Sequence, residues 1–154
     1  MIDKKPNESY QEWRDRVIDK ISPSFCGAKW YNATIWLNSG STASCHHPPA
    51  HKIPLEEVKS NYKAIHNTKY KKMVRKQMLE GERPKECEYC WKVEDLGKNY
   101  VSDRTYKSVI YKEQALEEAS KMDWQEDVPL KTLEIAFDAN CNLCLLYTSD
   151  AADE

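Results

Sequence analysis

Four of the six cysteines in this 154-residue chain are spaced in a way that suits metal binding. Cys87 and Cys90 form a Cys-x2-Cys pair, which places two thiolates on one tight turn so that both can reach the same centre. Cys26 and Cys45 stand on either side of a predicted hairpin, which would bring them together. Four soft thiolates complete the coordination of one tetrahedral zinc ion or of one cubane iron–sulfur cluster, and their spacing does not choose between the two.

Other interpretations of these side chains remain open. The four cysteines could be buried and inert small apolar residues, an interpretation that suits Cys26 alone better than all four. Three histidines, His46, His47 and His51, lie close behind Cys45 in the sequence. An imidazole can replace a thiolate as a ligand, but we expect these histidines to support the ligands from outside or to face solvent.

The composition excludes several classes of protein. Apolar residues make up 40% of the chain and charged residues 31%, which argues against a disordered tail or a membrane protein. No run approaches the roughly 18 apolar residues that a membrane-spanning helix needs. Residues 1–10 lack the apolar stretch of a secretion signal, so we expect a cytoplasmic protein. In that reducing compartment, cysteines are more often metal ligands or redox groups than disulfides.

The charge pattern gives little reason to expect a nucleic-acid partner, because the net charge is −2. A basic band nevertheless spans the middle of the chain, and it predicts either the solvated face of a helical region or a patch for an acidic partner. Its members are Lys59, Lys63, Lys69, Lys71, Lys72, Arg75, Lys76, Arg83 and Lys85.

The elements that must position the cysteines can be read from the periodicity of apolar residues. Helical spacing predicts helices over about 9–21, 55–65, 68–80 and 112–122. Two β-rich runs at 30–37 and 42–45, joined by a turn at 38–41, predict the hairpin. Apolar residues that alternate at 130–137 predict one more strand. The fold class is therefore α+β, with a small cysteine-rich domain built from a hairpin and helices.

The short sequence motifs around the cysteines resemble those of a known family. The runs at 24–30 (SFCGAKW), 44–48 (SCHHP), 66–68 (HNT) and 83–91 (RPKECEYCW) resemble the twitch or SPASM type of auxiliary domain in radical SAM enzymes. They also resemble a group from phage and environmental genomes in which this domain precedes the catalytic core. The resemblance covers roughly residues 20–143. It implies that Cys26, Cys45, Cys87 and Cys90 ligate one auxiliary [4Fe-4S] cluster, which serves electron transfer or substrate placement.

A second motif resembles the start of the radical SAM core. In that superfamily a Cys-x3-Cys-x2-Cys loop follows the first strand of a (β/α) barrel, and catalytic loops in barrels follow the C-terminal ends of strands. Here the strand at 131–137 is followed by Cys141, which takes the place of the first cluster ligand. The pattern then fails, because Cys144 comes one residue early and no third cysteine follows. The resemblance implies a second [4Fe-4S] cluster and S-adenosylmethionine in a full-length parent enzyme.

The run at 144–154 looks like a translated sequencing adapter, so we exclude it from the fold. We expect a twitch/SPASM-like domain over 1–100, a helical linker over 101–128 and the beginning of a truncated barrel over 129–143. The strand of that barrel would then have no sheet to join. The fragment itself would have no radical SAM activity.

The leading function is thus the N-terminal fragment of a radical SAM enzyme with an auxiliary cluster. The parent would act on a peptide or protein and take electrons from a reductant such as a flavodoxin or ferredoxin. The alternative is a non-catalytic module in which four cysteines bind zinc and the basic helices meet a partner.

Overall fold

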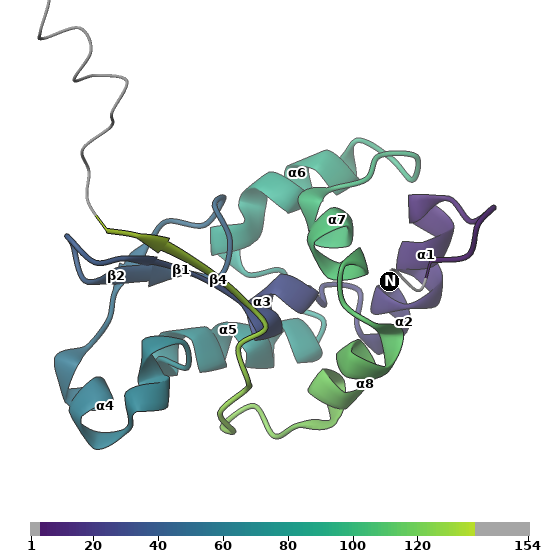
Figure 1. Ribbon diagram of the computed structural model, residues 1–154. Helices are drawn as coiled ribbons and strands as arrows, with labels where there is room; N and C mark the ends of the chain where they lie inside the picture. Colours follow the sequence, from purple (N-terminus) through teal and green to yellow (C-terminus); the bar gives the residue numbers. More distant parts are fainter. Residues whose placement is uncertain (1–3, 138–154) are drawn as a thin grey trace, which may run out of the picture.

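The predicted hairpin lies at the centre of a small mixed sheet. The computed structural model describes residues 4–137, and their four strands have the order β3-β2-β1-β4 (Figure 1). β1 (Asn32–Trp36) and β2 (Ser41–Ala43) are antiparallel, which confirms the hairpin. Gly40 adopts a φ of 59°, a left-handed conformation that glycine reaches without steric cost, at the turn between them. β3 (His51–Lys52) adds to β2 in the antiparallel sense.

The last strand, β4 (Thr132–Ala136), joins this same sheet. It pairs in parallel with β1 along its full length, from Asn32 opposite Thr132 to Trp36 opposite Ala136. The expectation that this strand has no sheet to join is therefore wrong. A parallel partner needs a long crossover connection, and the helices between β1 and β4 supply it.

Helices make up most of the remaining described chain, and the predicted α+β class is confirmed. The predicted helix at 9–21 is split into two at Val17. Trp30 was expected to begin the first strand of the hairpin, but it lies in a helix. The α-helices are α1 (Tyr10–Arg16), α2 (Ile18–Ile21), α3 (Gly27–Tyr31), α4 (Leu55–Ser60), α5 (Lys69–Leu79), α6 (Glu88–Asp95), α7 (Asp103–Val109) and α8 (Glu113–Lys121). Two 3-10 turns, η1 (Tyr62–Ile65) and η2 (Lys85–Cys87), complete the set. Among residues 4–137, none of the helices has both the length and the apolar character needed to cross a membrane.

Helix ends follow from local side chains. Ser9 and Glu12 form a reciprocal capping box at the start of α1, where each side chain bonds the other residue's backbone N–H. Thr68 caps α5 by accepting a hydrogen bond from the N–H of Lys71 at 3.1 Å. Gly81 follows the end of α5 with a φ of 81°.

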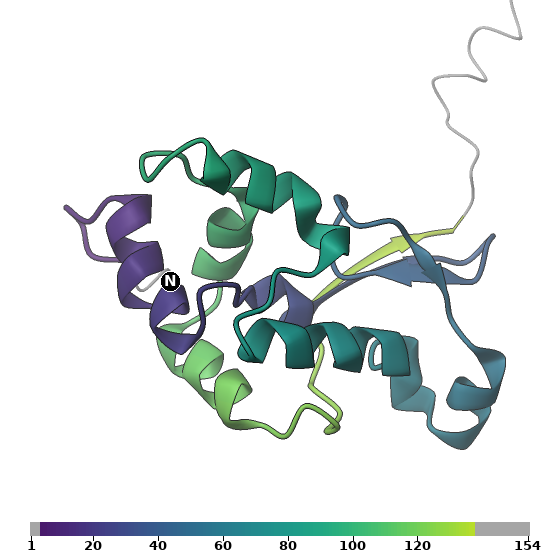
Figure 2. The same ribbon diagram turned by 180° about the vertical axis from the view of Figure 1, so that it is seen from behind.

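The apolar core lies around the short helix α3, which contacts both α5 and α7 (Figures 1 and 2). Phe25 and Trp30 are fully buried, with ring centroids 4.4 Å apart. Gly27 permits close approach to α8, because a Cβ there would lie 2.7 Å from Leu116. The segment expected as a linker, 101–128, supplies buried side chains to this same core, including Leu116 and Val128.

The basic band does not lie wholly in solvent. Lys71 and Arg75 of α5 are buried, with 3% and 1% of their surface exposed, so the expected solvated face is wrong for these two residues. Arg75 donates to the carbonyl of Lys29 at 2.9 Å and to the side chain of Asn67 at 2.7 Å. Lys71 donates to the hydroxyl of Thr42 at 2.8 Å. These bonds fasten α5 to α3 and to the hairpin.

Candidate metal centre

All four sequence-predicted ligands line one enclosed cavity between the hairpin and α3, α6 and α7. Cys26 precedes α3, Cys45 follows β2, Cys87 ends η2, and Cys90 lies in the first turn of α6. None of the four forms a disulfide, and only Cys45 is partly exposed. The fold therefore brings together thiols from three segments of the chain.

The sulfur atoms, as they are placed, lie too far apart to hold one metal ion. A tetrahedral zinc ion with Zn–S bonds of about 2.3 Å holds its sulfur ligands about 3.8 Å apart. Among residues 4–137, no three cysteine sulfurs lie within 4.8 Å of one another. The cysteines thus face a common space without forming a preassembled zinc site. In a [4Fe-4S] cluster each thiolate binds a different iron atom, so wider spacing is expected.

The cavity between the thiols is small and closed by large side chains. Its volume is about 20 Å³, measured as positions open to the centre of a water molecule, which is close to the space of one water. Met78 and Trp91 form part of its wall, and both are buried. A cluster would have to displace part of this wall, and an unbranched methionine adapts to such changes most easily.

Burial favours the neutral form of the Cys45, Cys87 and Cys90 thiols. It raises the pKa of Cys87 and of Cys90 to about 12, and it raises the pKa of Cys45 as well. A metal must therefore displace protons from these thiols when it binds. Hydrogen-bond donors oppose the effect of burial: the N–H of His47 points to Cys45, and the N–H of Arg104 points to Cys90.

A buried cation lies beside the thiols. Lys29 of α3 lines the cavity, donates to Cys87 and forms an ion pair with Glu86, and its side chain is 4% exposed. Burial alone would lower the pKa of Lys29, but Cys87, once it ionises, and the Glu86 carboxylate raise it above its ordinary value. Lys29 thus stays protonated and places a positive charge where thiolates would form.

Arg104 joins three segments of the cavity wall. Its Nη1 donates to the carbonyl of Phe25, beside Cys26, at 2.9 Å. Its Nε donates to Glu94 of α6 at 2.9 Å, and Nη2 lies 2.9 Å from Asp19 of α2. These contacts hold the residues around Cys26 and α6 in fixed positions relative to α7.

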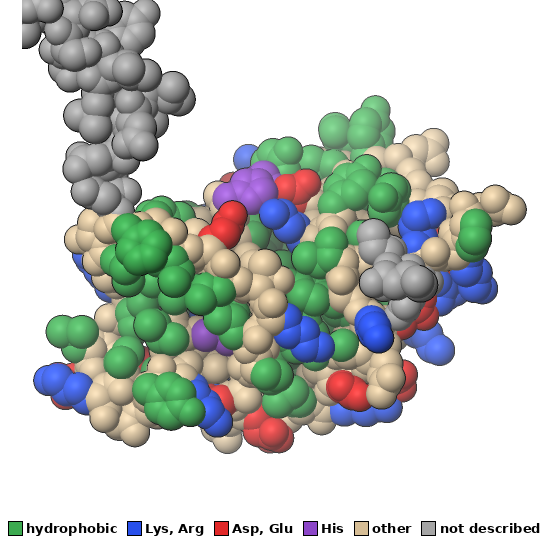
Figure 3. Space-filling model, viewed as in Figure 1, with side chains coloured by type: hydrophobic (Ala, Val, Ile, Leu, Met, Phe, Trp, Pro, Cys, Tyr) green, Lys and Arg blue, Asp and Glu red, His purple; other side chains and the backbone are tan. Residues whose placement is uncertain are grey.

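The histidines near Cys45 do not share one role. His47 lines the cavity and lies 2.7 Å from a carboxylate oxygen of Asp103, whereas His46 is more exposed and lies 3.4 Å from the same oxygen. Figure 3 shows histidine side chains at the surface beside acidic ones, between the sheet and α6. His51 bonds Thr68 at 3.0 Å and takes no part in the cavity wall.

Sequence reasoning missed Lys29, Asp103 and Arg104. Lys29 is the single charged residue in the otherwise largely apolar segment SFCGAKW, and this pattern indicates a lysine that is buried and paired. Asp103 and Arg104 begin α7, within the segment expected as a helical linker. Nothing in the local pattern pairs them with residues 46–47 or 94.

Comparisons with protein-family models, curated proteins and solved structures found no match for this chain. The family resemblance of the cysteine-containing words stays a prediction for that reason. Cys141, the predicted first ligand of the radical SAM motif, and the run at 144–154 lie outside the described residues.

Proposed function

We propose that this chain belongs to a radical SAM enzyme and holds an auxiliary [4Fe-4S] cluster through Cys26, Cys45, Cys87 and Cys90. One observation carries the proposal: four cysteines from three segments line a single cavity. Cys141 would belong to a second cluster that binds S-adenosylmethionine in the complete enzyme.

The sulfur atoms, as they are placed, do not form a zinc site. No three of them lie as close together as one tetrahedral ion requires, within the part of the chain that the structure describes. The zinc-binding interaction module is also weakened by the burial of Lys71 and Arg75, because buried cations cannot meet a partner.

The residues around the cavity have roles that suit a redox centre. An iron–sulfur cluster, when bound, supplies one-electron transfer at a potential set by hydrogen bonds, charge and solvent access. Lys29 and Arg104 offset the negative charge of thiolate ligands. Backbone N–H groups of His47 and Arg104 donate to cysteine sulfurs. Trp91, which donates to the carbonyl of Pro84 at 2.9 Å, helps to exclude water.

Anaerobic reconstitution with iron and sulfide tests the proposal. We expect about four iron and four sulfide per chain, with a broad visible absorption that bleaches on reduction. Cys87→Ser should lose most of this iron. Cys141→Ser is the matched control, because it removes a thiol outside the proposed site and should keep the auxiliary cluster.

Two results would contradict the proposal. A colourless chain that holds one tight zinc ion after reconstitution would favour the zinc module instead. Equal iron contents in Cys87→Ser and in the unchanged chain would show that the cavity does not hold the cluster.

A further inference from the structure

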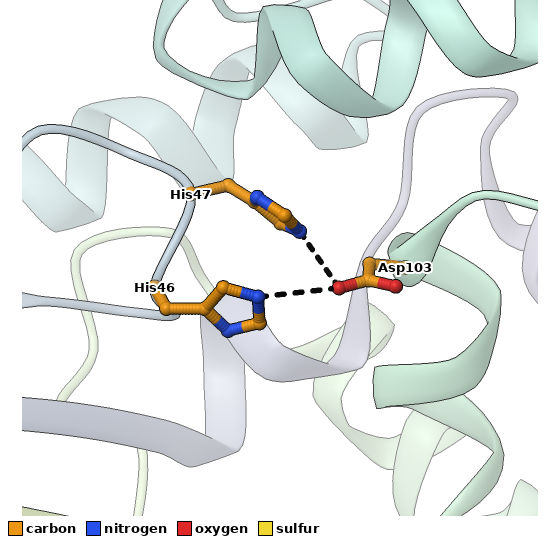
Figure 4. Close-up of side chains that lie close together, drawn as sticks. All are labelled: His46, His47 and Asp103. Carbon is orange, nitrogen blue, oxygen red and sulfur yellow. Dashed lines mark hydrogen bonds and ion pairs between the residues drawn. The ribbon is translucent and has the colours of Figure 1, made fainter.

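Three side chains outside the set of four cysteines converge at the edge of the cavity. His46 and His47 lie in the loop after β2, and Asp103 is the first residue of α7 (Figure 4). Both imidazoles direct Nε2 toward the same carboxylate oxygen of Asp103 (Figure 4). Within residues 4–137, this is the one group of three histidine, cysteine or acidic residues whose ligand atoms all lie within 4.8 Å of one another.

The distances are close to those of a metal site. An ion with bonds of about 2.1 Å to imidazole nitrogen and carboxylate oxygen separates its tetrahedral ligands by about 3.4 Å. Nε2 of His46 lies 3.4 Å from the oxygen of Asp103, which matches that separation. Nε2 of His47 lies 2.7 Å away, a hydrogen-bond distance that a small rotation of the Asp103 side chain would lengthen.

Ring stacking holds the two imidazoles in place. Tyr89 of α6 stacks on His47 with centroids 3.8 Å apart and an angle of 14° between the planes. His46 then packs against His47 at 4.1 Å. The stack restricts both rings before any ligand binds, which lowers the entropic cost of coordination.

The three side chains differ in their access to solvent. The exposed fractions are 56% for His46, 32% for Asp103 and 16% for His47. An ion bound here would have three protein ligands and at least one coordination position on the solvent side. That is the pattern of zinc sites that keep a position for water or substrate, and of two-histidine, one-carboxylate iron sites.

We propose that His46, His47 and Asp103 bind one divalent first-row transition ion, such as Zn²⁺, at the edge of the cysteine cavity. Imidazole and carboxylate suit borderline cations, whereas the four thiols suit softer centres, so the two sites differ in what they bind. The ion would join the loop after β2 to α7 and offer its open position to an oxygen atom of water or of a substrate. This proposal does not depend on the identity of the centre in the cysteine cavity.

Calorimetric titration with Zn²⁺ tests the site in the complete chain after anaerobic reconstitution. We expect His46→Ala and Asp103→Asn each to remove one zinc ion per chain, or to weaken its affinity at least about tenfold, since even the loss of a supporting contact costs a metal site that much. His51→Asn is the control, because His51 lies outside the group and should leave zinc binding unchanged. Circular dichroism checks that each variant folds, and His46 is exposed enough that its removal should not affect folding.

The comparison between variants remains valid if the cysteines also take zinc, because every protein would then gain the same additional ion. Co²⁺ provides a second measurement. Visible bands that disappear in Asp103→Asn, without sulfur-to-cobalt charge transfer, would support the site. Equal zinc binding in His46→Ala, Asp103→Asn and the unchanged chain would overturn the proposal, as would cobalt bands that arise only from sulfur ligands.

Discussion

Substitution of Glu94 tests whether its buried hydrogen bonds stabilise the wall of the cavity. Its carboxylate accepts hydrogen bonds from Nε of Arg104 at 2.9 Å and from Nη2 at 3.0 Å, and a further one from the hydroxyl of Ser102. The side chains of Glu94 and Arg104 are only 8% and 2% exposed. Glu94→Gln keeps the size of the side chain but removes its charge, and it turns an amide N–H₂ group toward donors.

The expected loss of stability follows from this burial. Removing one partner of a buried ion pair costs about 3–5 kcal/mol, because the other charge is left without compensation. Arg104 keeps a second partner, Asp19, at 2.9 Å. We therefore expect the lower end of that range, about 3 kcal/mol, which corresponds to a melting temperature about 6–12 °C lower for a chain of this size.

Urea unfolding followed by circular dichroism measures the effect. The same helix carries the matched control, Glu88, whose ion pair with Lys92 at 3.2 Å has side chains 60% and 72% exposed. Glu88→Gln makes the same chemical change at the surface and should cost at most about 0.5 kcal/mol. If Glu94→Gln and Glu88→Gln unfold at the same urea concentration, the buried network does not stabilise the cavity wall.

Three further predictions concern other parts of the molecule. Burial, and to a lesser degree nearby cations, lower the pKa of His66 to about 3, whereas the unfolded chain binds this proton near the ordinary value of 6.5. Between these two pKa values the unfolded state therefore binds more protons than the folded state. The contribution of His66 to the free energy of unfolding is complete above pH 6.5, and that free energy falls by about 2 kcal/mol at pH 5. Urea unfolding at pH 5 and above pH 6.5 measures this loss, which His66→Gln should largely abolish. Gly27→Ala should destabilise the chain by about 1–3 kcal/mol, because its Cβ would meet Leu116 at 2.7 Å and Tyr111 at 3.0 Å; an unchanged urea midpoint would contradict this packing. Cys87→Ser should lower the melting temperature of the metal-loaded chain and have little effect without metal. Equal melting temperatures of the metal-loaded variant and the metal-loaded unchanged chain would argue against a stabilising centre.

The helices and the hairpin could be predicted because their signals are local. The capping residues Ser9 and Thr68 and the turn glycine at position 40 act within a few residues of the backbone groups that they affect. The boundary between α3 and β1 was missed, because Trp30 and Tyr31 suit a strand by residue type yet lie in a helix.

The orientation of α5 could not be predicted in the same way. On the apolar side that the spacing predicts, Val74 and Met78 are buried, but Tyr70 and Met73 are about half exposed. Lys71 and Arg75 are buried as well. A cationic side chain can be buried without a large energetic cost only where hydrogen-bond acceptors surround it. Those acceptors are Thr42 and the carbonyl of Lys29, which come from segments far away in the sequence.

The sequence by itself determined which side chains could bind metal, because thiols and their spacing are properties of residue type and order. Only the tertiary structure decided that Cys26, Cys45, Cys87 and Cys90 face one cavity, since this depends on how α3, the hairpin and α6 pack. Likewise, β4 pairs with β1 about 100 residues earlier, and Asp103 meets His47 across 56 residues. Such long-range contacts arise from burial and hydrogen bonding summed over the whole fold, which no local pattern contains.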